Sequence, residues 1–379
     1  MSARRIAPIL GYAALAALVL AWGPPGSRAR EHPGSPGRRA ATGAFGTSRS
    51  SDEPQHRQYE RARETGRGRH ARAPWQIPWA GWKDIFWRTY EQTGEHRLLA
   101  VAAGVVFYSL LALFPAITAL VSLYGLFASP ASISEHLSSL SGLLPAGAFD
   151  IFQEQVTRIT QNGGGKLGLA FLLGLGMALW SANAGMKAIF DALNVVAEEK
   201  EKRGFIKLNL VTLCCTIGGL VAILLAIGLV VAVPLLLGHL GLGRFGELLI
   251  EVLRWPVLLL VMIVGLAVIY RYAPSRTEPR WQWLSVGSIL AAILWLASSA
   301  LLSWYLSNFA NYNATYGSLG AAIGLMIWMW ISAIVILLGA ELNSEVEHQT
   351  AEDTTVAGDK PLGARGAVMA DTVGQAKAA

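Results

Sequence analysis

The chain has 379 residues, of which 53% are hydrophobic and only 15% are charged, and its formal net charge is +6. Soluble globular proteins carry about 25% charged residues, so this composition excludes an ordinary soluble domain. Residues 98–134, 208–238 and 281–340 contain no Asp, Glu, Lys, Arg or His at all. Because roughly 20 apolar residues cross the hydrocarbon core of a bilayer, stretches of this length predict membrane spans.

The first 23 residues have the features of a secretory signal. Arg4 and Arg5 precede an apolar run over 6–22, and Ser27 and Ala29 resemble the small residues of a cleavage site. An extra span, an interfacial helix and an unused upstream start codon are the alternatives that the sequence leaves open. We do not count this segment among the spans.

Residues 24–74 are rich in Arg, Gly, Pro and Ser and nearly lack aliphatic side chains. Such a segment buries too little apolar surface to offset the entropy of ordering, so we predict a disordered, cytoplasmic, Arg-rich tail. Anionic lipid headgroups are its expected partner, at about 1 kcal/mol for each basic residue near the surface. RNA binding without sequence preference is the alternative, and no specific nucleic-acid partner is expected.

Residues 75–97 are rich in tryptophan and carry charges of both signs. Trp82, Ile85 and Phe86 recur at helical spacing. This pattern predicts an amphipathic helix that lies in the membrane interface with its aromatic rings at headgroup depth.

Residues 98–347 contain six apolar stretches and are predicted to form a six-helix membrane domain. The expected spans are 98–127, 167–188, 208–237, 255–270, 283–306 and 317–342. Residues 348–379 are small and polar and predict a flexible cytoplasmic tail. The predicted fold class is therefore all-α, a polytopic helical membrane protein with about six transmembrane helices.

The basic residues of the loops predict the orientation. If the N-terminal tail is inside, the inner segments between residues 72 and 280 carry twelve Lys and Arg and the outer loops carry four. Cytoplasmic loops carry the excess of positive charge, so we expect both termini in the cytoplasm of a bacterial cell and the spans in its inner membrane.

Polar side chains near the span ends are the candidate functional residues, because a buried polar group in a membrane is costly unless it is used or paired. Asn183, Lys187 and Asp191 follow at i, i+4 and i+8, and Lys187 and Asp191 are spaced to pair. The remaining candidates at the inner ends are Glu95, His96, Asn194, Tyr270, Arg271, Tyr272, Glu341 and Asn343, and those at the outer side are Asn308, Tyr312 and Tyr316. They predict a polar path for a substrate or proton; the alternative is a set of snorkelling helix ends.

Catalytic chemistry has weaker support. Glu341, Glu345 and His348 are the best acid–base cluster, at the end of the last span, and no second ligand group accompanies them in the sequence. We therefore expect no enzyme activity, no metal and no cofactor. The chain has no G-x-x-x-x-G-K-[ST] loop, so any transport within this chain is expected to be secondary or facilitated.

Several segments resemble the YihY/BrkB-like inner-membrane family, formerly called ribonuclease BN. They are FYSLLALFPAITALVSLYG (107–125), LWSANAGMKAIFDALN (179–194), RYAP (271–274) and WYLSNFANYNATYGSLGAAIGLMIWMWISAIVILLGAELN (304–343). The resemblance covers about 82–345 and implies a six-helix inner-membrane protein with an envelope-related role such as transport or export of a small solute or lipid. A structural or scaffolding membrane protein with a lipid-binding tail is the alternative, and a ribonuclease is the least favoured. The sequence indicates neither a substrate nor an oligomeric state.

Overall fold

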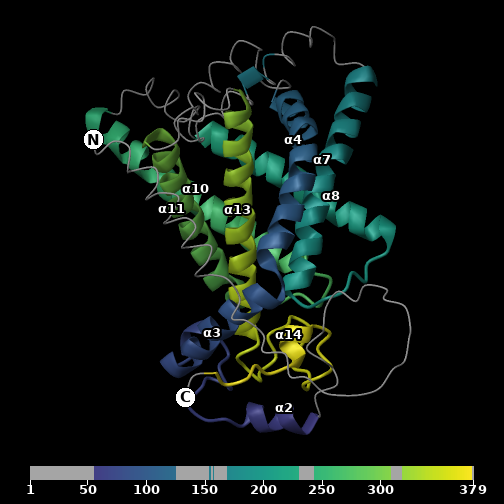
Figure 1. The fold of residues 1–379 in the computed structure, drawn as a ribbon, viewed down its shortest axis with the longest axis vertical. Helices are drawn as coiled ribbons and strands as arrows, with labels where there is room; N and C mark the ends of the chain where they lie inside the picture. The colour runs from purple at the N-terminus through teal and green to yellow at the C-terminus, as the bar shows by residue number, and fades with distance from the viewer. Residues whose placement is uncertain are drawn as a thin grey trace, which may run out of the picture.

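The computed structural model describes residues 55–124, 153, 154, 157, 169–229, 243–308 and 318–377 (Figure 1). Within these ranges the chain is helical, and the only strand-like pairing there is a single antiparallel bridge between Pro279 and Thr355. The helices are α2 (Gln55–Ala62), α3 (Trp79–Glu95), α4 (Leu98–Tyr124), α7 (Leu169–Val196), α8 (Phe205–Ile227), α10 (Gly243–Tyr272), α11 (Ser285–Asn308), α13 (Ser318–Glu347) and α14 (Val368–Asp371), with short 3-10 turns η2 (Pro74–Gln76) and η4 (Trp281–Leu284).

Five described segments are long and apolar enough to cross a membrane. They are Leu98–Leu120, Phe205–Ile227, Trp255–Tyr272, Trp281–Leu306 and Ala322–Glu347. Helix α7 is a sixth long helix, of 28 residues, and packs along α4 and α8. It carries the polar residues Asn183, Lys187 and Asp191 in its second half. The predicted all-α fold with about six spans is confirmed.

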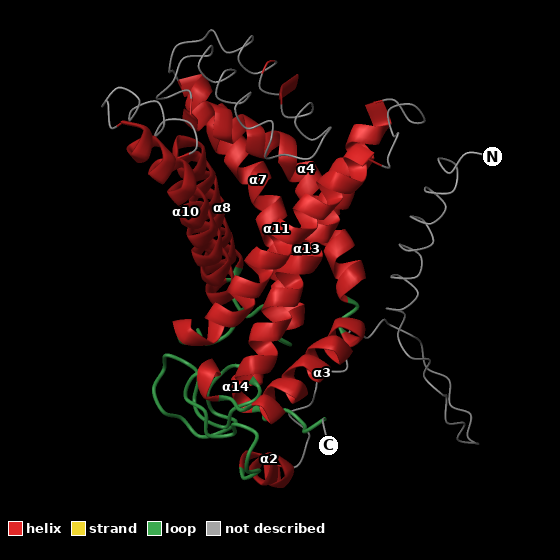
Figure 2. Ribbon diagram, turned by 90° about the vertical axis from the view of Figure 1, so that its left-hand side faces the viewer, coloured by secondary structure: helices red, strands yellow, loops and turns green. Residues whose placement is uncertain are grey.

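The six long helices close into a ring. In the order α4, α7, α8, α10, α11, α13, each helix packs against the next, and α13 returns to α4 (Figures 1 and 2). Buried side chains such as Phe190, Leu193 and Leu337 form the core between them. Large apolar side chains, among them Leu225 and Leu301, remain exposed on the outside. An apolar outer face of this kind is stable only against hydrocarbon.

Helices α11 and α13 approach most closely at two glycines. A Cβ added to Gly287 would lie 2.0 Å from the carbonyl oxygen of Gly339, and one added to Gly339 would lie 2.7 Å from the Tyr270 hydroxyl. Asn343 secures this crossing, because its Oδ1 accepts from the Gly287 amide at 2.7 Å and its Nδ2 donates to the Leu284 carbonyl at 3.1 Å. Small residues at a helix crossing allow this backbone approach in membranes.

The ends of the described chain fold together against one end of the ring, at the bottom of Figures 1 and 2. We call residues 55–77 together with 348–377 the terminal cap. The Arg69 side chain is 1% exposed and donates to the carbonyls of Gln349 (3.1 Å) and Gly374 (2.7 Å). The amide of Val373 donates to the Gln58 side chain at 2.7 Å.

The terminal cap corrects two predictions. The disorder predicted for 24–74 is wrong for 55–74, and the flexible tail predicted for 348–379 is wrong for 348–377. Arginines of the first segment serve as multiple hydrogen-bond donors to carbonyls of the second, so the two polar segments satisfy each other. Inside the second, Arg365 donates to the carbonyls of Ala370 and Ala351, both at 2.7 Å. Residues 1–54, including the signal-like segment, lie outside the described residues.

Helix α3 is amphipathic in an unusual sense, because its buried face includes charged groups. Asp84, Arg88 and Gln92 are each 0% exposed, together with Ile85. The opposite face exposes Trp79, Phe86, Trp87 and Tyr90. An exposed aromatic face suits headgroup depth, and the interfacial location of α3 stays a prediction.

The glycine crossing gives a first prediction. Gly287→Ala forces a methyl group into the α13 backbone, so we expect a loss of about 1–3 kcal/mol of stability, the usual cost of overpacking. Gly218→Ala on α8 is the matched control, since a Cβ there meets nothing within 4 Å, and it is expected to be neutral or slightly stabilising. Unfolding of both variants in detergent measures the difference; equal stabilities would contradict the crossing.

A buried polar cluster at the capped end of the bundle

His96 lies at the junction of three elements. It is the C-cap residue of α3, and Arg97, in the left-handed region with φ 49°, turns the chain into α4. Its Nδ1 is 3.0 Å from Oε2 of Glu341 on α13, and its Nε2 is 3.8 Å from Oε1 of Glu198, which follows α7. One imidazole therefore joins two carboxylates from two other parts of the fold.

Glu198 holds its position through a strained turn. The Glu199 amide donates to the Asn194 carbonyl and the Glu198 amide to the Val195 carbonyl, which is the Schellman ending of a helix. That motif places its C′ residue in the left-handed region and usually carries Gly there, whereas Glu198 adopts φ 54°. The conformation costs about 1–2 kcal/mol for a residue with a side chain. Arg97 and Glu198 are the only residues other than glycine with positive φ in the described part.

The environment of His96 favours its charged form. Burial by itself lowers the pKa of His96, but the hydrogen bonds and negative charges of Glu198 and Glu341 outweigh it and raise the pKa to about 10. His96 is therefore an imidazolium at neutral pH, with two carboxylates as its partners.

The two carboxylates have more acceptor capacity than the cluster fills. Glu341 is 0% exposed, and its Oε1 has no hydrogen-bond partner; Oε2 of Glu198 is likewise buried without one. The second oxygen of Glu198 accepts a long hydrogen bond of 3.4 Å from Gln92. Two carboxylates and one imidazolium leave one net negative charge in a largely buried cluster, which is costly unless a cation or proton neutralises it.

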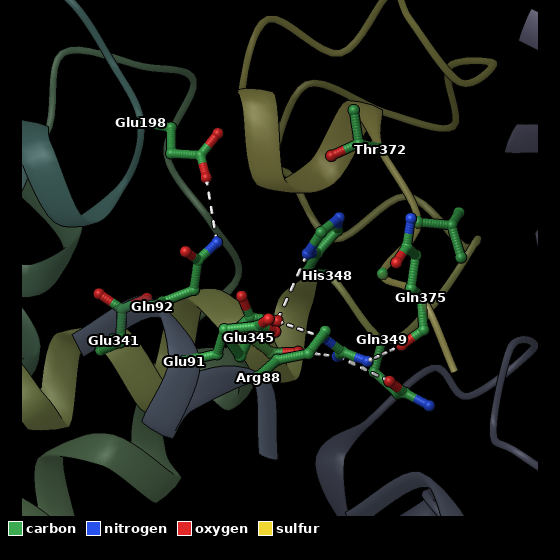
Figure 3. A network of polar contacts seen from close by, with 12 residues as sticks. Arg88, Glu91, Gln92, Glu198, Glu341, Glu345, His348, Gln349, Thr372 and Gln375 are labelled. Atoms are coloured by element: carbon green, nitrogen blue, oxygen red, sulfur yellow. Dashed lines mark hydrogen bonds and ion pairs between the residues drawn. The ribbon is translucent and has the colours of Figure 1, made fainter. Parts of the chain in front are cut away.

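A second polar network, drawn in Figure 3, adjoins this cluster along helix α13. Arg88 pairs with Oε2 of Glu345 at 2.5 Å and donates to Gln349 Oε1 at 2.8 Å and to the Gln375 carbonyl at 3.0 Å. His348 Nδ1 lies 3.4 Å from the same carboxylate. Arg88 thereby joins α3, α13 and the terminal cap, and Glu345 is committed to an arginine.

The predicted residues of α7 do not form one continuous path. Asn183 is buried and its Oδ1 accepts from Thr216 of α8 at 3.1 Å, while its Nδ2 has no partner. The Lys187 ammonium lies 5.3 Å from the ring centroid of Trp180 and Asp191 is exposed, and the Lys187–Asp191 pair stays a prediction. Asn194 instead bonds the Ser275 amide at 2.7 Å.

Most of the other predicted residues make structural bonds. Tyr270 donates to the Ile336 carbonyl at 2.7 Å, Arg271 donates to the Pro279 carbonyl at 2.6 Å and lies over the Trp281 ring, and Asn343 secures the glycine crossing. Asn308 donates to the Trp304 carbonyl of its own helix. Tyr312 and Tyr316 lie outside the described residues. Of the predicted residues, His96 and Glu341 enter the cluster.

The sequence placed His96 with Glu341 among the polar residues at the inner span ends, and Glu198 is the member of the cluster that sequence reasoning missed. Nothing in the local sequence marks Glu198, because its role follows from a helix ending that composition would assign to Gly. Within the described ranges, no group of three His, Cys, Asp or Glu residues is arranged to hold a metal ion.

A cavity of about 200 Å³ lies between α4, α7, α11 and α13. Its lining is apolar apart from Ser109, Ser332 and the indoles of Trp295 and Trp328. Trp295 donates to Ser332 at 2.9 Å and Trp328 to Ser299 at 3.1 Å, so these indoles are satisfied. Three of the four lining helices lead to the cluster: His96 precedes α4, Glu198 follows α7, and Glu341 on α13 is one turn beyond the lining residue Leu337.

Comparison with known proteins identifies the family of the chain. The family model described as "Virulence factor BrkB" matches residues 89–362. The chain belongs to the BrkB family. It is 33% identical over 267 residues to the "Putative ribonuclease-like protein YfkH" of Bacillus subtilis, covering 69% of this chain and 93% of that protein. It is 26% identical over 290 residues to a "UPF0761 membrane protein" of Tolumonas auensis, covering 73% and 88%.

No solved structure matches the chain. The bacterial relatives and the apolar helices make this BrkB-family chain a multi-pass protein of the bacterial inner membrane. The family match ends before α14 and begins after residues 55–77, so the terminal cap is built largely from segments that flank the matched region.

The pKa of His96 predicts a pH dependence. A pKa raised from 6.5 to about 10 contributes stability that is fully present below about pH 6.5 and is lost as the pH rises through 10. We expect wild-type protein to lose stability between pH 7 and 10 and His96→Gln to lose less over that range. His70→Gln, at an exposed histidine, is the control. Parallel pH profiles for wild type and His96→Gln would contradict the assignment.

The Arg88–Glu345 pair predicts a coupled stability effect. Arg88→Met removes the arginine partner of a buried carboxylate, and we expect a loss of about 3–5 kcal/mol in detergent unfolding. Adding Glu345→Met removes that carboxylate and should recover a large part of the loss, so the two changes are not additive. Lys83→Met, on the exposed face of α3, should be nearly neutral. Additive losses would show that the two residues act separately.

Proposed function

We propose that this protein is a secondary or facilitated transporter that moves a small solute or lipid across the inner membrane in an envelope-related role. The observation that carries the proposal is the cavity between α4, α7, α11 and α13, with the cluster of His96, Glu198 and Glu341 at the ends of three of these helices. Buried ionisable groups within a helical membrane bundle are functional candidates by default.

The lining of the cavity supports a substrate with a large apolar part. Most lining side chains are apolar, and the serine hydroxyls of Ser109 and Ser332 are its small polar groups. A volume of about 200 Å³ is below the range of about 300–1,000 Å³ that is common for drug-sized ligands. It therefore fits a small neutral solute or a part of a lipid.

A ribonuclease, which the name of the Bacillus subtilis relative suggests for that protein, has less support in this chain. Glu345 of the best sequence-predicted acid–base cluster is buried against Arg88 and His348, and a carboxylate held by an arginine is a poor base.

The second candidate function is that of a scaffolding membrane protein that binds the lipid surface. The exposed aromatic face of α3 favours it.

Reconstitution into liposomes tests the transporter. One arm follows a fluorescent phospholipid analogue by dithionite quenching, and the other follows entry of glycerol by vesicle swelling. We expect a rate above that of empty vesicles in one arm, reduced at least about tenfold by Ala333→Phe, which fills the cavity. Leu301→Phe on the exposed face of α11 is the matched control. Rates equal to those of empty vesicles in both arms would favour the scaffold.

A further inference from the structure

We infer that His96, Glu198 and Glu341 form a proton-binding site, in which Oε1 of Glu341 takes up one proton from the aqueous phase. The inference concerns this site alone and does not require that the protein transports anything. It goes beyond the polar path predicted from the sequence, because it assigns a proton to one stated atom and includes Glu198, which lies outside the predicted set.

The hydrogen bonds of the Glu341 and Glu198 carboxylates support proton binding. An ionised carboxylate only accepts, and a buried one needs several donors. Glu341 has one donor, His96, on Oε2, and its Oε1 is buried without any partner. Glu198 repeats the pattern, with a long contact to Gln92 on one oxygen and none on the other. The cluster has more hydrogen-bond acceptor atoms than donor hydrogens, and a proton bound to Glu341 supplies one further hydrogen.

The net charge of the groups around Glu341 also favours uptake of one proton. Glu341 faces His96 from the α3–α4 junction, Glu198 from the end of α7, and Glu345 from its own helix. Glu345 is neutralised by Arg88 of α3 and faces His348, and on the other side of α3 Glu91 is neutralised by Lys377. The imidazolium of His96 balances one of the two remaining carboxylates. One negative charge is left, and binding of one proton by Glu341 brings the sum to zero.

The backbone of two residues at the cluster adopts a left-handed conformation. The described part has two residues other than glycine at positive φ, and they are Arg97, next to His96, and Glu198 itself. Strained residues of this kind cluster at functional sites. Gly would relieve the strain at 198 but would carry no carboxylate, which accounts for the presence of Glu there.

Infrared spectroscopy of the full-length protein in lipid nanodiscs tests the site directly, since a protonated carboxylic acid has its own C=O band. At about pH 6, where exposed carboxyl groups are ionised, we expect this band in wild type and in Glu95→Gln, whose exposed carboxyl adjoins His96. The band should be missing in Glu341→Gln, which mimics the protonated form. No band in wild type, or a band unchanged in Glu341→Gln, overturns the inference.

A second variant keeps the test decisive if Glu341→Gln fails to fold. Glu198→Gly relieves the left-handed turn and removes one neighbouring negative charge, so proton binding should weaken about tenfold and the midpoint of the band should move down by about one pH unit. An unmoved midpoint overturns the site. Because the readout involves no substrate, a band that behaves as expected in a protein inactive in liposomes would reject the transporter and keep the proton site.

Discussion

The cost of burying charge in an apolar bundle determines the arrangement of this structure. Arg69 and Arg88 are almost fully buried, and an unpaired buried guanidinium would be strongly destabilising. Each therefore has several acceptors, and many of these are backbone carbonyls of the C-terminal segment. These carbonyls and arginines satisfy one another, and removal of either side would leave some buried hydrogen-bonding groups of the other without partners.

The sequence predicted what depends on local composition. Runs without ionisable residues predicted the spans, since only hydrocarbon stabilises such runs. The observed helices differ from the predicted spans mainly in where they begin and end. Helix α10, for example, begins at Gly243, whereas the predicted span begins near residue 255. It could not predict the terminal cap, because Arg69 and Gly374 are 305 residues apart in the sequence. The composition of a polar, arginine-rich segment also does not show whether the folded chain places hydrogen-bond acceptors beside it. Similarly, Gly287 and Gly339 show their role only once α11 and α13 cross.

The same limit applies to the candidate site. Glu341 was identifiable because a carboxylate at the end of an uncharged run needs an explanation. Its partners come from the α3–α4 junction and from the end of α7, and their convergence is a property of the closed ring of helices. Asn194, Tyr270 and Asn343 looked equivalent to Glu341 in the sequence, yet each is satisfied by backbone groups of a neighbouring segment.

One face of α13 connects all of these features. Ala333 and Leu337 line the cavity, Glu341 follows one turn later in the cluster, and Glu345 one turn after that binds Arg88. Because a helix moves as a rigid element, a change at any one position is felt by the others through small shifts of packed side chains. Neutralising Glu341 would weaken its attraction to His96, while Glu345 on the same face stays bound to Arg88 and so to the terminal cap.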